Sequence, residues 1–214
     1  MLKIDGYVLV GGKSSRMGTN KFALSLGGAT FAELAVLALR KIAENRVYFI
    51  VGANQKDAAA ELLPLDVPRV ADVLPDKGAL GGIYTALQYS KSNSKSEWIA
   101  ILACDFPFVT DDLFVRLTET AESIDANVSA VAPVQTDGRV QPLCAIYRVE
   151  PCLKIAGKLM ENEKVPAARE LLENAAAHLI DFDQLADLPG ADRFFTNVNT
   201  PEDFLLIQSR IDND

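Results

Sequence analysis

The 214-residue sequence predicts a three-layer α/β sandwich around a mostly parallel sheet. Short apolar runs of strand type alternate with segments of helical periodicity, and the connections between them are short. Several of these runs are apolar on both faces, which is typical of strands covered by helices on both sides. The pattern shows no internal repeat and no long linker, so we expect a single domain spanning residues 1–214.

The predicted strands are short and rich in apolar and β-branched residues, and the one before Asp105 is the strongest. In chain order they are Tyr7–Val10, Val47–Val51, Arg69–Asp72, Glu97–Cys104, Asn127–Val134 and Leu179–Phe182.

The first predicted helix begins after Thr30, because Thr30 and Glu33 have the spacing of a capping box. Its pattern continues to Asn45. Further helices are predicted at Gln55–Leu63, Leu80–Ser90, Thr110–Ser123, Pro151–Asn162, Val165–Asn174 and Thr200–Ile211. The serine-rich segment Ser90–Ser96 is interpreted as a surface loop.

Composition excludes several classes of function. A content of 49% hydrophobic and 23% charged residues is that of a soluble globular protein, and a net charge of −8 disfavours a nucleic-acid surface. The sequence has no apolar run near the ~20 residues that span a bilayer and no signal-peptide pattern, so we expect a cytoplasmic protein without a membrane partner. Cys104, Cys144 and Cys152 form no metal-binding or disulfide pattern and are interpreted as buried apolar residues, and His178 as a bystander rather than a base.

The segment GGKSSRMGTNK, residues 11–21, follows the first predicted strand. Its glycines permit close approach of a ligand to the backbone, and Lys13, Arg16 and Lys21 supply positive charge with no carboxylate between Asp5 and Glu33. It is therefore a candidate phosphate-binding loop, with a solvated basic turn as the alternative. Neither the P-loop nor the dinucleotide-binding glycine pattern fits its register.

Three more segments carry candidate ligand-binding residues. Asp105 follows the strongest strand and can hold a hard cation such as Mg²⁺, although a turn aspartate is an alternative. Asp72 precedes the glycine-rich segment Lys77–Gly82, which leads into a helix. Asn197 and Asn199 offer amide oxygens beside a predicted helix start at Thr200. Because ligands of parallel sheets bind at the carboxyl ends of the strands, we expect these residues to share one crevice.

In this order, the segments resemble those of the molybdenum cofactor guanylyltransferases, members of the nucleotidyltransferase superfamily. The opening G-G-x-S-S-R-M-G favours the guanylyl over the cytidylyl branch. The matching elements, which span nearly the whole chain, are Leu9–Gly18 with Lys21, Asp72, Gly78–Gly82, Cys104–Phe108, Gln141–Tyr147 and Asn197–Asp203.

The resemblance implies the Rossmann-like sheet of the nucleotidyltransferase fold and an Mg²⁺-dependent transfer of GMP from GTP to molybdopterin or Mo-molybdopterin. The acceptor phosphate attacks the α-phosphorus and pyrophosphate leaves, so no protein nucleophile is needed. Molybdoenzymes or their chaperones are implied as further partners.

The resemblance also implies roles for single residues. Lys21 and the segment from Leu9 to Gly11 would hold the triphosphate, Arg16 would stabilise charge on the leaving group, and Asp105 would bind the metal. Asp72 would contact the nucleoside, and Asn197 and Asn199 would lie near the acceptor or a metal-bound water. The catalytic residues are thus Arg16, Lys21 and Asp105, and the binding residues are Leu9, Val10, Gly11, Gly12, Lys13, Ser14, Lys21, Gly52, Asp72, Gly81, Asp105, Asn197 and Asn199.

At four positions the sequence departs from the family pattern: Asn20 replaces an aspartate, Gly52 an asparagine, Ala79 a proline and Gln141 a histidine. Together these departures leave a different base or acceptor open. The alternatives are a molybdopterin cytidylyltransferase, another small-molecule nucleotidyltransferase, or a non-catalytic nucleotide-binding relative.

Overall fold

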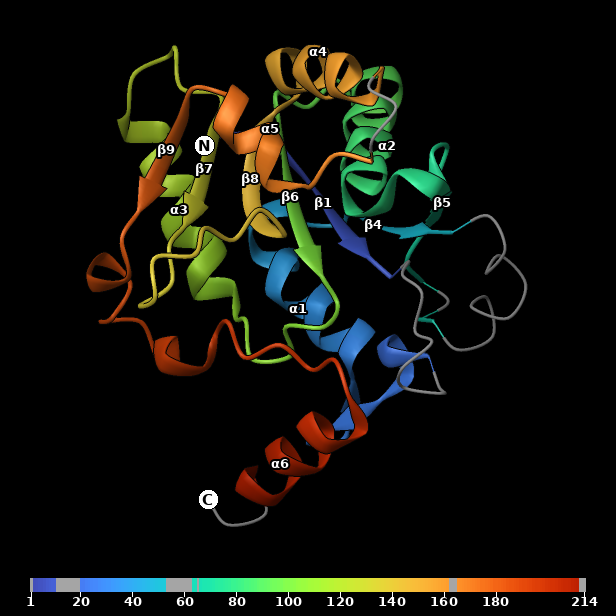
Figure 1. The fold of residues 1–214 in the computed structure, drawn as a ribbon, viewed down its shortest axis with the longest axis vertical. Helices are drawn as coiled ribbons and strands as arrows, with labels where there is room; N and C mark the ends of the chain where they lie inside the picture. The colour runs from blue at the N-terminus through green and yellow to red at the C-terminus, as the bar shows by residue number, and fades with distance from the viewer. Residues whose placement is uncertain (1, 11–19, 53–62, 65, 162–164, 212–214) are drawn as a thin grey trace.

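The computed structural model describes residues 2–10, 20–52, 63–64, 66–161 and 165–211. Within these residues, seven strands form one sheet in the order β5-β4-β1-β6-β8-β7-β9 (Figure 1). Only β8 runs antiparallel to its neighbours in this sheet, β6 and β7, and the other described pairs are parallel. The strands are β1 (Ile4–Leu9), β4 (Val47–Val51), β5 (Arg69–Ala71), β6 (Trp98–Ala103), β7 (Ala130–Pro133), β8 (Cys144–Arg148) and β9 (Ala177–Ile180), and a separate hairpin pairs β2 (Ser25–Leu26) with β3 (Ala29–Thr30).

Helices cover both faces of the sheet, which confirms the predicted three-layer α/β sandwich. The helices are α1 (Phe31–Ala43), α2 (Gly78–Asn93), α3 (Asp111–Ser123), α4 (Val149–Met160), α5 (Arg169–Asn174) and α6 (Pro201–Ile211). Side chains of α1 and α3 share one buried cluster, and those of α2, α4 and α5 share another on the opposite face. In Figure 1, α2 and α4 lie side by side, and α6 projects from the end of the molecule that carries the C-terminus.

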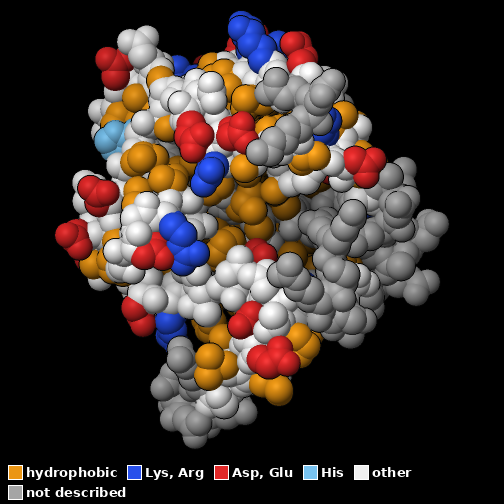
Figure 2. All heavy atoms as spheres, viewed as in Figure 1, with side chains coloured by type: hydrophobic (Ala, Val, Ile, Leu, Met, Phe, Trp, Pro, Cys, Tyr) orange, Lys and Arg blue, Asp and Glu red, His pale blue; other side chains and the backbone are white. Residues whose placement is uncertain are grey.

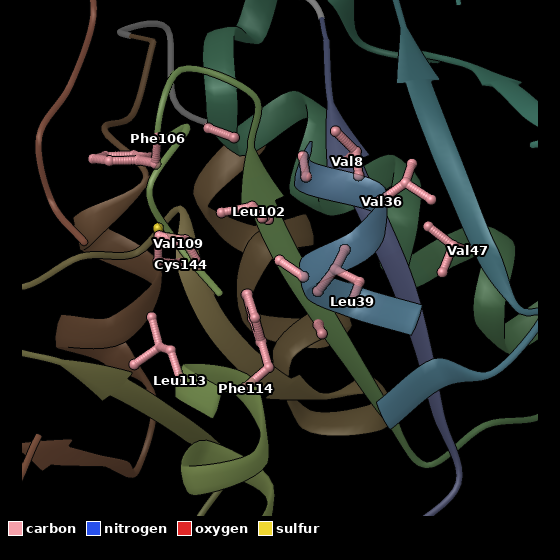
Figure 3. Close-up of a cluster of buried hydrophobic side chains, with 14 of the residues drawn as sticks. Val8, Val36, Leu39, Val47, Leu102, Phe106, Val109, Leu113, Phe114 and Cys144 are labelled. Carbon is pink, nitrogen blue, oxygen red and sulfur yellow. The ribbon is translucent and has the colours of Figure 1, made fainter. Parts of the chain in front are cut away.

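The two cores arise because successive side chains of a strand point to opposite faces. In β1, Val8 belongs to the cluster under α1 and α3, whereas Leu9 belongs to the one under α2 and α4. Figure 3 shows the first cluster, where Leu39 of α1 and Phe114 of α3 approach Leu102 of β6. The continuous apolar runs of the sequence therefore correspond to strands buried on both faces.

The predicted capping box of α1 is present. The Glu33 backbone N–H donates to Thr30 Oγ1 at 3.2 Å, and the Thr30 backbone N–H donates to Glu33 Oε2 at 2.7 Å. The backbone N–H of Thr30 and then its hydroxyl stabilise the charged carboxylate, so the pKa of Glu33 is lowered from its ordinary value of 4.5.

Three substitutions test this cap. Thr30→Ala is expected to lower the free energy of unfolding by about 1 kcal/mol at neutral pH, whereas Thr30→Ser should keep it. Because the folded-state pKa of Glu33 is lowered, its stabilising contribution is present above pH 4.5 and is lost as the pH falls through the folded-state value. The stability difference between wild type and Glu33→Gln should therefore shrink from pH 7 to about pH 3 in urea unfolding. An equal difference at both pH values would contradict this assignment.

The interpretation of Ser90–Ser96 as a surface loop is wrong. Helix α2 continues to Asn93, and the hydroxyls of Ser90 and Ser96 donate to the fully buried carboxylate of Asp5 at 2.6 and 2.7 Å. Ser94 also donates to Asp5, and the Arg46 guanidinium donates to it at 3.1 Å. A buried carboxylate needs hydrogen-bond donors, and these serines supply them from inside the protein.

The predicted start of β1 at Tyr7 is also wrong. The strand begins at Ile4, and the polar residue Asp5, which seemed to precede the strand, lies inside it. Other bounds differ as well. Strand β8 was not predicted, the last strand is Ala177–Ile180 and contains His178, and of the helix predicted at Val165–Asn174 only Arg169–Asn174 is helical. Of the helix predicted at Gln55–Leu63, residues 55–62 lie outside the described residues, and Leu63 is in a bend.

Cys104, Cys144 and Cys152 are free and buried, which confirms their interpretation as small apolar residues. Burial raises the pKa of all three thiols, that of Cys152 to about 12. Within the described part of the chain, there is no group of three or more His, Cys, Asp or Glu side chains suited to a metal ion, and no helix combines the length and apolarity needed to span a membrane.

Candidate active site

A pocket of about 480 Å³ lies where four parallel strands end. Leu9 and Val10 at the end of β1, Gly52 after β4, Asp72 after β5 and Asp105 after β6 all line it. The carboxyl ends of neighbouring parallel strands meet at one edge of a sheet, and this is where such folds bind ligands. Figure 2 draws the molecule in the same view as Figure 1. It shows a hollow in the middle of the face turned to the viewer, with hydrophobic side chains on the floor of the hollow.

One side of the pocket carries a cluster of polar side chains from segments far apart in the sequence. Lys21, the first residue of the 3-10 helix η1 (Lys21–Ala23), donates from Nζ to Asn199 Oδ1 at 2.7 Å. The same Nζ lies 4.0 Å from Asp105 Oδ2. The Val198 backbone N–H donates to the Asp105 carbonyl oxygen at 3.1 Å, so the segment before α6 is attached to the end of β6.

The start of α6 holds Asn199 in place. The backbone N–H groups of Asn199 and Thr200 donate to Asp203 Oδ2 at 2.8 and 2.9 Å, and the Asp203 N–H donates to Thr200 Oγ1 at 3.2 Å. These bonds satisfy the free N–H groups at the helix start, as the sequence pattern Thr200-Pro201 predicts. The Asn199 side chain is left to contact Lys21.

Asp105 is held in a setting that disfavours its charge. Burial raises the pKa of its carboxyl group, and the charge of Lys21, followed by the Asp105 backbone and the Asn197 side chain, opposes this rise only in part. Asp105 Oδ1 and Asn197 Oδ1 are buried and have no hydrogen-bond partner within the described residues. A buried carboxylate oxygen and a buried amide oxygen that are both unpartnered match the ligand type of a hard divalent cation.

Asp72 lies on the opposite side of the pocket and is fixed by hydrogen bonds. Its backbone N–H donates to the Val51 carbonyl at 2.8 Å, and its Oδ1 accepts from Leu74 N–H at 2.9 Å and from Thr85 Oγ1 at 2.7 Å. Gly81 does not line the pocket, but its α2 backbone approaches this turn so closely that a Cβ would lie 2.3 Å from the Leu74 carbonyl oxygen.

The structure thus brings together most of the described residues that the sequence predicts for the site. Leu9, Val10, Lys21, Gly52, Asp72 and Asp105 line the pocket, Asn197 and Asn199 adjoin it, and Gly81 lies behind it. Gly11, Gly12, Lys13, Ser14 and Arg16 lie outside the described residues.

Sequence reasoning missed several lining residues. Phe22 follows Lys21, Leu143 lies within the recognised element Gln141–Tyr147, and Pro75 and Asp76 precede the glycine-rich segment, so their position in the sequence could have indicated them. Val165 is half exposed and lines the pocket from the segment before α5, for which the sequence gives no signal.

Comparisons with known proteins show which family the chain is similar to. The sequence matches the MobA-like NTP transferase domain family over residues 6–179. It is 33% identical over 206 residues to a protein of Carboxydothermus hydrogenoformans, covering 95% of this chain and 94% of that protein. It is 32% identical over 216 residues to one of Bacillus cereus, covering both chains completely. Both relatives are named "Probable molybdenum cofactor guanylyltransferase".

Two solved structures are similar in fold. Molybdopterin-guanine dinucleotide biosynthesis protein A from Archaeoglobus fulgidus superposes with a TM-score of 0.78 at 21% identity, covering 98% of this chain and all of that one. A 4-diphosphocytidyl-2C-methyl-D-erythritol synthase from Anaerococcus prevotii gives 0.68 at 12% identity, covering 99% and 96%. These likenesses confirm the nucleotidyltransferase fold that the sequence resemblance implies.

Proposed function

The chain belongs to the MobA-like NTP transferase domain family and is a nucleotidyltransferase, and from this premise we propose that it transfers GMP from GTP to molybdopterin or Mo-molybdopterin. Pyrophosphate is the second product, and Mg²⁺ is the required cation. The observation that supports this most directly is the approach of Lys21 to Asp105 within one pocket, because a cation and a carboxylate side by side suit a metal-bound triphosphate.

The residues of the site have distinct tasks in this proposal. Asp105 and Asn197 would hold the divalent cation through their unpartnered oxygens, and the cation would neutralise charge on the phosphates. Lys21 binds phosphate oxygens, and Asn199 orients its ammonium group. Asp72 contacts the nucleoside from the other side of the pocket. Arg16 and the segment from Gly11 to Ser14 complete the triphosphate site, as the family resemblance implies.

The reaction needs no covalent enzyme intermediate. A terminal phosphate oxygen of the acceptor forms a bond to the α-phosphorus of GTP while the bond from that phosphorus to the pyrophosphate oxygen breaks. The protein contributes orientation and fixed positive charge in a partly desolvated pocket, which are the main sources of rate in such transfers. The loaded cofactor is then passed to molybdoenzymes or their chaperones.

The test is a pyrophosphate-release assay with the full chain, molybdopterin, Mg²⁺ and each of the four NTPs. We expect release with GTP, and its loss when EDTA removes the cation. Release with CTP alone would assign the protein to the cytidylyl branch, for which Gly52 in the pocket wall offers a reason, since it lacks the side chain expected there. Binding of GTP without release under any condition would identify a non-catalytic relative.

A further inference from the structure

Thr85 of α2 makes a set of hydrogen bonds next to the pocket but does not line it. It is 2% exposed and does not line the pocket. Its Oγ1 donates to Asp72 Oδ1 at 2.7 Å and accepts from the Val73 backbone N–H at 3.1 Å. One hydroxyl therefore joins the helix that forms one wall of the pocket to the turn that carries Asp72.

The distribution of bonds on the Asp72 carboxylate indicates what this contact does. Within the described residues, both hydrogen bonds to the carboxylate fall on Oδ1, one from Leu74 N–H and one from Thr85. The second oxygen, Oδ2, stays available as an acceptor for a donor group of a ligand. Fixing one oxygen of a planar carboxylate from two directions fixes the position of the other.

A second threonine shows that this arrangement is not the usual behaviour of a helical threonine. Thr118 of α3 is 8% exposed, and its Oγ1 donates to the carbonyl of Phe114, four residues earlier, at 2.8 Å. Thr85 Oγ1 likewise lies 3.0 Å from the carbonyl oxygen of Gly81, which is also four residues earlier. Bonding to the preceding turn is common for helical threonines. The contact with a carboxylate is what distinguishes Thr85.

We propose that Thr85 is a positioning residue for the nucleotide: its hydroxyl holds the Asp72 carboxylate so that Oδ2 accepts a hydrogen bond from the nucleoside of the bound NTP. This rests on the proposed function in so far as the ligand is a nucleoside triphosphate. The residue acts on binding and not on the transfer step, because Asp72 lies across the pocket from the Lys21 and Asp105 cluster.

The experiment measures the Kd for GTP with Mg²⁺ by calorimetry on the full chain, and kcat and KM in the pyrophosphate assay. Thr85→Val keeps the shape of the side chain but removes the hydroxyl, and it should raise Kd and KM about tenfold with little change in kcat. Thr85→Ser keeps the hydroxyl and should therefore have the Kd and KM of the wild type. Thr118→Val is the matched control and should leave them unchanged. Thr85→Ala provides a second variant without the hydroxyl, and thermal unfolding shows that each variant is folded.

A double-mutant cycle tests whether the effect passes through Asp72. In an Asp72→Ala background, Thr85→Val should change Kd less than twofold. A further tenfold loss there would overturn the proposal, as would a Kd for Thr85→Val equal to that of Thr118→Val. Because Kd needs no turnover, a chain that binds GTP but releases no pyrophosphate would contradict the proposed function and leave this test intact. A wild-type chain that binds none of the four NTPs would overturn both.

Discussion

Asp105→Asn is expected to lower pyrophosphate release about 10²–10³-fold, the range found when a single charge-stabilising group is removed from an active site. The substitution keeps the size of the side chain but removes the negative charge that a divalent cation requires. Asp105 Oδ1 is buried and has no hydrogen-bond partner within the described residues, so it is the oxygen that we expect to bind the cation.

The same substitution should raise thermal stability. The surroundings of Asp105 raise the pKa of its carboxyl group, so at neutral pH the folded state carries a charge that its burial disfavours. Removing the charge removes this penalty, and an opposite effect on stability and activity is common at active sites. Melting temperature and turnover, measured on the same preparation, check both effects.

The control for Asp105→Asn is Asp66→Asn. Asp66 is exposed and pairs with Arg40 at 2.8 Å on the surface, so its loss should change neither quantity appreciably. If Asp105→Asn kept activity within a few-fold of wild type, Asp105 would not be the metal ligand.

Gly81→Ala is expected to lower the free energy of unfolding by about 1–3 kcal/mol, because the added methyl group would lie 2.3 Å from a backbone carbonyl, that of Leu74. The carbonyl belongs to the turn between Asp72 and α2, so relief of the clash must move one wall of the pocket. The Kd for GTP should therefore rise as well. Chemical denaturation and calorimetry measure the two effects.

Gly157 of α4 offers a matched comparison with Gly81, since both glycines lie within helices. A Cβ at Gly157 would meet Tyr84 Cε2 at 3.9 Å, an ordinary contact, so Gly157→Ala should raise stability by about 0.5–1 kcal/mol and leave nucleotide binding unchanged. The prediction for Gly81 fails if the two alanine variants behave alike.

The parts of the fold that were predicted from the sequence depend on local signals. The capping box at Thr30 and Glu33 lies within one helical turn, and the buried run Val47–Val51 is apolar throughout, so neither requires knowledge of distant residues. The common edge for Asp72 and Asp105 followed from the rule for parallel sheets. That Lys21 approaches Asn199 was expected only as membership in the same crevice, because no local pattern relates residues so far apart in the chain.

The features that were missed depend on contacts between distant segments. The serines that surround Asp5 are separated from it by more than 80 residues, so their sequence resembles a surface loop. Thr85 likewise looks like an ordinary helical residue until the fold places Asp72 beside it. Strand β8 was also missed, and its pairing with β6, which places Leu102 opposite Cys144, is another contact between segments far apart in the chain.

Helix α2 is anchored to two acidic side chains, to Asp72 through Thr85 in its middle and to Asp5 through Ser90 in its last turn. Sliding the helix by one residue along the sheet would break both hydrogen bonds at once and remove one donor from each carboxylate. We therefore expect α2 to move little, so that the distance between the nucleotide site and Asp5 stays fixed. Accommodation of different bases would then have to come from the connecting segments around the pocket, while the helix keeps its place.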